Sequence, residues 1–215
     1  MSTAATGPDI NQLDLMNELV EVDGNVDAEQ FFNPPLADDG EHEVTLNMGN
    51  RGVKAERQWE GEGKARKRSG AGFLNIHLQL KQVKDNGEEG GTVAFDQLTT
   101  IPMDTNVGRT TRAHVVFDLA GFPLQEKSLG GLMQEIQLAV AQKPKVKAVT
   151  RWEAQVNSGT KDAPKYETVV QGQKNFPPLL DKDGNDTGRF NPEVTDPKSG
   201  QVVRAQVRVV KYGRA

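Results

Sequence analysis

The chain has 215 residues, of which 35% are hydrophobic and 22 are glycine, and this is enough for a single domain with a packed core. Cysteine is absent, which excludes disulfide bonds, thiol catalysis, zinc ribbons and iron–sulfur clusters. The formal net charge of −4 at first argues against a polyanionic partner.

The charge is, however, unevenly distributed along the chain. Residues 1–43 hold eleven acidic residues and no Lys or Arg, whereas residues 44–215 hold 26 basic and 19 acidic residues. An acidic arm of charge −11 thus precedes a basic body of charge +7, an asymmetry that points to nucleic-acid binding. No apolar run reaches the ~18 residues of a membrane span, and residues 1–9 do not resemble a signal peptide. We therefore expect no membrane partner and a cytoplasmic location, in the host cytoplasm if the protein is viral.

The arm, residues 1–40, is expected to be partly disordered or to form one short helix, because Asp9 can cap a segment with apolar residues at helical spacing. Pro34 and Pro35 end any such helix, since the residue before a proline disfavours the helical region. The acids suit three roles: a solubilising tail, a contact for replication or recombination proteins, or an occupant of the body's own basic groove that DNA displaces. On the last hypothesis, removing the arm tightens DNA binding.

Alternation of apolar and polar residues predicts the first strands of the body. Glu43 to Met48 is a short strand, and Phe73 to Val83 is the clearest strand of the chain, with one apolar and one polar face. Residues 50–72 between them carry seven basic and three acidic residues and a single Trp, which predicts a mobile loop. An Asn-Gly turn within residues 84–91 leads to a third strand, Thr92 to Ile101.

The spacing of apolar residues then changes to a helical period. A first helix is expected near residues 110–122, although a strand over residues 114–117 fits the same pattern. A second helix is capped by Ser128 and ends before Pro144. These helices separate the third strand from those that follow.

Three more strands complete the predicted elements. Alternation places them at residues 145–157, 166–172 and 201–212, with an irregular excursion rich in proline and glycine over residues 175–200. Trp152 shares the apolar face of the first of these strands, so we expect its ring in the core.

No arrangement of residues points to an enzyme. The three histidines, His42, His77 and His114, belong to no metal-binding pair, and Gly63-Lys64 is followed by Ala65 where a phosphate-binding loop needs Ser or Thr. We therefore expect no catalysis, no cofactor and no bound metal, and an enzyme that uses unassigned carboxylates is only the third alternative.

The body instead offers what binding of single-stranded nucleic acid requires, namely cations for the phosphates and flat rings on which bases stack. The candidates come from the basic loop, the polar face of the next strand, the fourth strand and the start of the fifth. The predicted nucleic-acid-binding residues are Arg51, Lys54, Arg57, Trp59, Lys64, Arg66, Lys67, Arg68, Phe73, Arg151, Lys165 and Tyr166.

Several of these residues have a structural alternative. Trp59 lies among charged residues and glycines, which suits base stacking and a loop anchor equally. The run from Lys64 to Arg68 also fits a merely solvated stretch of charge, and Phe73 could close one end of a barrel.

The order of elements narrows the choice of fold. A strand, a long loop, two strands, a helical link and two further strands is the order of the OB fold, whose strands 2 and 3 and loops after strands 1 and 4 bind the ligand. We predict a mainly β (α+β) body, residues 41–215, built as a five-stranded Greek-key OB barrel. The helical link lies between strands 3 and 4, and a C-terminal extra strand and hairpin follow the barrel.

Residues 32–212 resemble a known family. Five segments carry the resemblance to phage-encoded OB-fold single-stranded-DNA-binding proteins of replication and recombination modules: Gly108–Arg112, Ala120–Pro123, Thr150–Ala154, Asn175–Pro177 and Val203–Ala205. The resemblance implies a non-catalytic protein that binds and protects single-stranded DNA, without strong sequence preference, during phage DNA replication or recombination. The alternative is a β-rich structural or assembly protein of a virion. The sequence leaves open whether the chain forms a homo-oligomer.

Overall fold

The structure is a computed structural model, and it describes residues 14–24, 26–28, 40–61, 66–157, 159–160, 163, 165–170, 178–180, 183–190, 193–196, 200 and 202–215. The strands are β1 (Gly40–Glu60), β2 (Lys67–Val83), β3 (Glu89–Thr99), β4 (Met103–Thr105), β5 (Gly108–Thr110), β6 (Lys145–Asn157), β7 (Tyr166–Val170), β8 (Pro178–Leu180), β9 (Asp186–Phe190), β10 (Glu193–Thr195), β11 (Val202–Arg204) and β12 (Gln206–Arg214). The longer helices are α3 (Arg112–Leu119) and α4 (Leu129–Ala141). The protein is therefore mainly β, as predicted.

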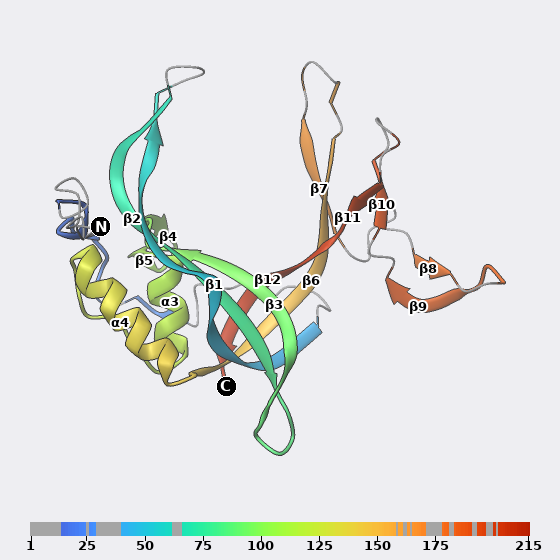
Figure 1. Ribbon diagram of the computed structural model, residues 1–215, viewed down its shortest axis with the longest axis horizontal. Helices are drawn as coiled ribbons and strands as arrows, with labels where there is room; N and C mark the ends of the chain where they lie inside the picture. The colour runs from blue at the N-terminus through green and yellow to red at the C-terminus, as the bar shows by residue number, and fades with distance from the viewer. Residues whose placement is uncertain are drawn as a thin grey trace, which may run out of the picture.

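An antiparallel sheet organises the molecule, with strand order β12-β6-β1-β2-β3 and with β7 paired to β6 (Figure 1). β1 can join both halves of this sheet because it is long. Its first residues, 40–45, pair with β6, and most of its length pairs with β2. In the described residues no ladder joins β3 to β12, so the sheet is not the closed barrel that the element order predicted.

Side chains, rather than backbone, join the two edge strands. The Tyr212 hydroxyl of β12 donates to the Asp96 carboxylate of β3 at 2.8 Å, and Arg112 donates to Asp96 at 3.2 Å and to the Val209 carbonyl at 2.9 Å. Burial, reinforced by Asp96, raises the pKa of Tyr212 well above its ordinary value. The phenol therefore keeps the proton that it donates, and the contact holds the sheet edges together.

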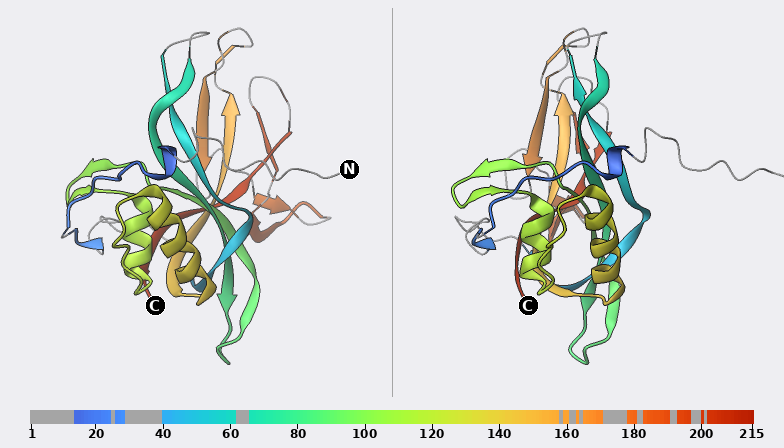
Figure 2. Two further views of the ribbon diagram at one scale, coloured as in Figure 1. Left: turned by 60° about the vertical axis from the view of Figure 1, so that its left-hand side comes forward. Right: turned by 90° about the vertical axis from the view of Figure 1, so that its left-hand side faces the viewer.

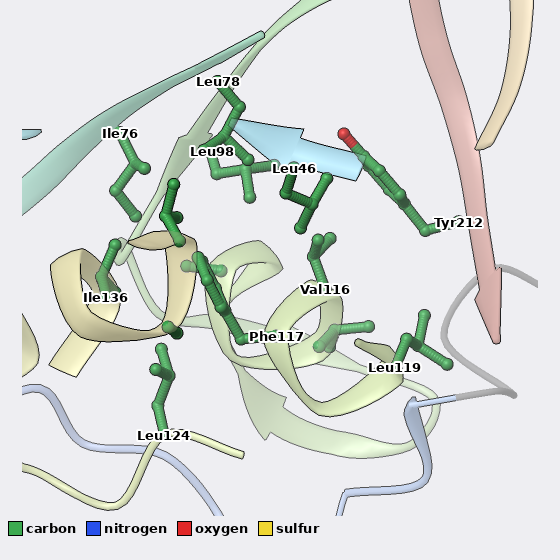
Figure 3. Packing of buried hydrophobic residues seen from close by; sticks show 14 of the residues in the cluster. Leu46, Ile76, Leu78, Leu98, Val116, Phe117, Leu119, Leu124, Ile136 and Tyr212 are labelled. Carbon is green, nitrogen blue, oxygen red and sulfur yellow. The ribbon is translucent and has the colours of Figure 1, made fainter. Parts of the chain in front are cut away.

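The main core lies between the sheet and the two helices. Thr111 caps α3 and Ser128 caps α4, each accepting a backbone N–H three residues ahead, as expected for N-cap residues. α4 packs against β1 and β2, and α3 packs against β3 and β12. Figure 3 shows the strand leucines of this core facing Phe117 and Ile136 of the helices. The predicted helix over residues 110–122 is thus confirmed, and the strand alternative for residues 114–117 is wrong.

A second, smaller core lies where β7, β10 and the residue after β11 meet β6. Ala154, Val156, Val169, Val194 and Ala205 are its buried residues. Trp152 packs against them, so the prediction that this ring contributes to a core is confirmed.

The largest departure from the sequence prediction concerns residues 50–72. β1 continues to Glu60 and β2 already begins at Lys67, so most of the predicted loop is a long β-hairpin. Val53 and Ala55 pack against the main core, whereas the residues between and beside them are polar. Hydrogen bonds between β1 and β2 make these residues a strand pair, although the sequence does not show the alternation that predicts a strand.

The later elements follow the prediction in part. β6 has the predicted bounds, while the excursion over residues 175–200 contains β8, β9 and β10. The predicted last strand is divided at Ala205 into β11 and β12, and the hairpin of β4 and β5 was not predicted. Asn175–Pro177 lie outside the described residues.

The acidic arm is, in its described part, integrated into the body. Residues 14–16 are helical, and Leu15, Val20 and Ala28 are buried in the main core. The N–H of Val20 donates to the Lys127 carbonyl at 2.8 Å. Asp9, Pro34 and Pro35 lie outside the described residues, so the arm prediction is tested only between residues 14 and 28.

Candidate nucleic-acid interface

Two hairpins extend from the same end of the sheet. Figures 1 and 2 show the β1–β2 hairpin and the β6–β7 hairpin rising together on the side away from the β2–β3 turn. Nine of the twelve predicted nucleic-acid-binding residues lie in the strands of these two hairpins. Arg66 immediately precedes β2, Lys165 immediately precedes β7, and Lys64 lies outside the described residues.

The upper part of the β1–β2 hairpin carries a group that we call the Trp59 cluster, formed by Glu56, Trp59, Arg66 and Arg68. The guanidinium carbons of Arg66 and Arg68 lie 5.3 and 4.9 Å from the centre of the Trp59 ring, within cation–π range. The Trp59 side chain is 48% exposed. An accessible ring with two cations on it combines the two features that a stacked nucleotide needs.

Glu56, three residues before Trp59 on β1, holds Arg68 in this cluster. Its carboxylate accepts a hydrogen bond from Arg68 at 2.6 Å. The hydrogen bond from Arg68 is the main cause that lowers the pKa of Glu56, with Asn75 and Lys54 acting in the same direction and burial opposing them. The Glu56 carboxylate is therefore surrounded by cations, in a position that suits an anion.

Arg57 points to the opposite face from Glu56, because consecutive residues of a strand alternate in direction. Its Nη2 lies 2.6 Å from the Glu18 carboxylate of the arm, and its Nη1 donates to the Gly70 carbonyl at 3.2 Å. The prediction of Arg57 as a nucleic-acid-binding residue is therefore not supported, since its guanidinium already has an anionic partner and a structural role at the base of the hairpin.

The free energies of the arm's ion pair and of its buried side chains bear on whether DNA could displace residues 14–24. The ion pair between Glu18 and Arg57 is about one-third exposed, and such pairs stabilise by only ~0–1 kcal/mol. Leu15 and Val20, by contrast, are buried, and burying one such side chain is worth ~1.5–3 kcal/mol. Displacement would expose both, so the described arm is a fixed part of the body. The burial of these two side chains argues against a displaceable arm over residues 14–24, and the hypothesis stays a prediction.

The remaining hairpin candidates differ in exposure. Arg51, Lys54 and Lys67 are exposed and can meet a polyanion. Phe73 is only 8% exposed, so its ring is not accessible to a base, and its prediction as a stacking residue is wrong for this conformation. Alternation along its own strand had placed Phe73 on the polar face.

Sequence reasoning missed a second exposed ring on the outer face of β2 and β3. Phe95 of β3 is 62% exposed and lies opposite Gln79 of β2, and His77 lies opposite Gln97. We call these four residues the outer patch. The alternation of Ala94 and Leu98, both buried, with Phe95 is the signal that could have identified the ring.

His77 connects the outer patch to the basic hairpin. Burial, and then the positive charges of Arg51 and Lys54, lower the pKa of His77 below its ordinary value, while Glu56 acts in the opposite direction. The imidazole is therefore neutral near pH 7, and it lies in a positive electrostatic environment.

The second hairpin carries the other candidates. Tyr166, at the start of β7, is 66% exposed, and Lys165 beside it is paired with Glu167 at 3.4 Å. Arg151 lies lower on β6, where it donates to Glu153 at 2.7 Å. The structure thus divides the predicted residues between two hairpins, and Arg151 is largely neutralised by its neighbour.

A cleft of about 530 Å³ lies away from both hairpins, between the described arm and α3. His114 of α3 lines it, and its Nδ1 lies 2.8 Å from the Thr111 hydroxyl. Burial lowers the pKa of His114, with Glu135 acting in the opposite direction. The described lining also holds Glu21, Asp23 and Asp118, so this side of the molecule is acidic and does not suit a polyanion.

Comparison of the chain with protein-family models, with curated proteins and with solved structures found no match in any of the three. Within the described part of the chain, no helix is both long enough and apolar enough to span a membrane.

Proposed function

We propose that the protein binds single-stranded DNA, without catalysis and without strong sequence preference, through the β1–β2 hairpin and the outer patch. The observation that carries the proposal is the Trp59 cluster. Two arginines are held on an accessible tryptophan, on a strand pair that extends into solvent. Stacking on an aromatic ring and neutralisation of phosphates are the two sources of affinity that do not depend on base sequence.

The order of the strands supports an OB-type assignment for the body. If β1, β2, β3, β6 and β12 are numbered 1 to 5, the sheet reads 5-4-1-2-3, which is the strand order expected of an OB barrel that is opened between strands 3 and 5. The contact between Tyr212 and Asp96 lies at that opening. The hairpin then corresponds to the connection between strands 1 and 2, and the outer patch to the face of strands 2 and 3. Both are ligand-binding regions of the OB fold.

On this proposal, contacts with the nucleic acid replace some of the contacts within the Trp59 cluster. A base stacks on the Trp59 ring, and the displaced guanidinium of Arg66 or Arg68 turns to a phosphate. Phe95 offers a second ring, and Tyr166 and Lys165 offer a ring and a cation on the other hairpin. Because phosphate contacts release counterions, affinity falls with salt, with a slope near −0.7 in log–log form for each phosphate neutralised.

Fluorescence anisotropy of labelled oligo-dT, titrated with the protein at several salt concentrations, tests the proposal. We expect binding in dilute buffer, a negative salt slope and weak competition by duplex DNA. Binding that is absent in dilute buffer, or that does not respond to salt, contradicts the proposal. Size-exclusion chromatography without DNA then addresses the virion alternative, because an assembly protein should oligomerise by itself.

A further inference from the structure

Glu18 joins three parts of the molecule. One carboxylate oxygen contacts Arg57 of β1 at 2.6 Å, the other accepts the N–H of Gly72 of β2, and the backbone carbonyl accepts the N–H of Leu129 at 2.9 Å. Leu129 is the first residue of α4. A single residue of the arm therefore connects both strands of the hairpin to the helix layer.

We propose that residues 14–24 brace the β1–β2 hairpin and that Glu18 is the positioning residue that fixes its direction for nucleic acid. The inference rests on the proposed function, because the direction of the hairpin matters for affinity only if the hairpin contacts the ligand. The side chain of Glu18 bonds to Arg57 and Gly72, which lie outside the Trp59 cluster, and it acts through these two residues.

Packing at Gly72 shows how closely the arm is seated. A Cβ atom at this position would lie 2.4 Å from Leu15 Cδ1, 2.7 Å from Glu18 Oε2 and 2.8 Å from Leu129 Cδ1. All three distances are shorter than real Cβ contacts, so a side chain at residue 72 would force the side chains of Leu15, Glu18 and Leu129 to shift. Glycine is the residue that permits this close approach.

The brace lies beside one of the two register shifts of the hairpin. The pairing of β1 with β2 shifts between Arg57 and Trp59, and Arg57 bonds to the Gly70 carbonyl beside that irregularity. Such irregularities bend and twist a strand pair, so a small rotation at the base moves the tip by more. Trp59, Arg66 and Arg68 lie beyond this shift, and their position therefore depends on how Arg57 and Gly72 are held.

An opposite role for the same contact makes the opposite prediction. If Glu18 merely withheld Arg57 from DNA, removing its charge would free a cation, tighten binding and steepen the salt slope by about 0.7. If Glu18 positions the hairpin, the same change loosens the hairpin and weakens binding while the number of phosphate contacts stays constant. The buried Leu15 beside Glu18 favours the positioning role.

The first measurement compares two substitutions in the full chain, Glu18→Gln and Glu43→Gln. Each removes the carboxylate charge of an ion pair that involves a β1 residue: Glu18 pairs with Arg57 at 2.6 Å, and Glu43 pairs with Lys145 at 3.8 Å. We expect Glu18→Gln to weaken oligo-dT binding about 3- to 10-fold with an unchanged salt slope, which is the range for ordering a loose segment. Glu43→Gln should bind as the parent does, since neither partner of its ion pair belongs to the Trp59 cluster or to the outer patch. Gly72→Ala, which displaces the side chains of Leu15 and Glu18, should act in the same direction as Glu18→Gln.

The second measurement reports on the hairpin without DNA. Because the chain has no cysteine, Ser69→Cys and Gln137→Cys place spin labels on β2 and on α4 without background. Pulsed EPR should give a narrow distance distribution for the parent. The distribution should broaden with Glu18→Gln or Gly72→Ala and stay narrow with Glu43→Gln.

The outcomes separate the brace from the proposed function. If the parent protein does not bind oligo-dT, the function fails, whatever the EPR result. If the parent binds and Glu18→Gln changes neither affinity nor distance distribution, the brace is refuted. Tighter binding with a steeper salt slope also refutes it and assigns Glu18 the competing role. If Gly72→Ala does not fold, Glu18→Gln alone decides.

Discussion

The β1–β2 hairpin carries two ion pairs of equal length whose surroundings differ. Glu56 and Arg68 belong to the hairpin itself and lie beside the accessible Trp59 ring, whereas Glu18 reaches Arg57 from the arm, beside buried Leu15. The distance of 2.6 Å is the same in both, yet the Arg68 side chain is 46% exposed beside the Trp59 ring, whereas the Arg57 side chain is 33% exposed and is held by the arm and by the Gly70 carbonyl. The difference teaches that the environment of an ion pair, rather than its geometry, decides whether its cation is available to a ligand.

This comparison assigns the two ion pairs of the hairpin different tasks. The pair of Glu56 with Arg68, beside Trp59, belongs to the proposed ligand side, and the pair of Glu18 with Arg57, beside Gly72, belongs to the supporting side. The following substitutions test the assignment, in order of decreasing expected effect.

Removing the ring of the ligand side should have the largest effect. We expect Trp59→Ala to weaken oligo-dT binding by about 5- to 150-fold, equivalent to the ~1–3 kcal/mol of one base stack. Leu138→Ala on α4, which also truncates an exposed apolar side chain, should bind as the parent does. Anisotropy titration at one salt concentration measures both, and equal affinity of Trp59→Ala and parent would remove the ring from the interface.

Neutralising cations on the two faces should affect the salt dependence differently. The double variant Arg66→Gln/Arg68→Gln should make the log–log salt slope shallower by about 1.4, because each lost phosphate contact contributes ~0.7. Arg57→Gln should leave the slope unchanged, since its partner is Glu18. Titrations at four or more salt concentrations give the slopes, and equal changes for both faces would break the comparison.

A substitution in the outer patch tests how far the nucleic-acid interface extends beyond the hairpins. We expect Phe95→Ala to weaken binding about 5-fold, the lower end of the range for a stacked base, because the ring is exposed on β3. Met103→Ala, which shortens an exposed side chain on β4, serves as the control. An unchanged affinity for Phe95→Ala would confine the interface to the hairpins. Longer oligonucleotides should show a larger difference than short ones.

The smallest expected effect is a pH dependence from His77. In the free protein, burial and the charges of Arg51 and Lys54 lower its pKa, so the ring is neutral at pH 7. Nearby phosphates favour the protonated ring and raise its pKa, so binding takes up a proton and affinity rises as pH falls below the ordinary value of about 6.5. We expect roughly a twofold gain between pH 7.5 and pH 6. His77→Gln should reduce this gain, and an identical pH profile in the variant would exclude His77 as its source.

Much of the fold was predictable because its signals are local. The alternation in β6 and in Phe73 to Val83 reports a half-buried strand, and Ser128 and Thr111 act as helix caps wherever they precede a helical period. The hairpin beyond Met48 was mistaken for a loop because its residues are charged on both faces. Only pairing with β2 makes them a strand.

The residues of the candidate site likewise divide into those that local sequence predicted and those that only the structure revealed. The basic character of the neighbours of Trp59 was readable in advance, whereas the sequence left its ring open between base stacking and a loop anchor. Phe73 and Arg57 were misassigned because burial and partners come from distant segments. Phe95 was overlooked because one exposed aromatic in a strand is visible only when the inward residues are known.

The amino-acid sequence alone determined the basic body, the acidic arm, the helix caps and the alternating strands, since these depend on composition and on neighbours a few residues apart. The tertiary structure alone decided that the sheet stays open between β3 and β12, that Glu18 meets Arg57 and Gly72, and which rings face solvent. Contacts across long stretches of chain are set by how the strands and helices pack, and side-chain burial follows from that packing.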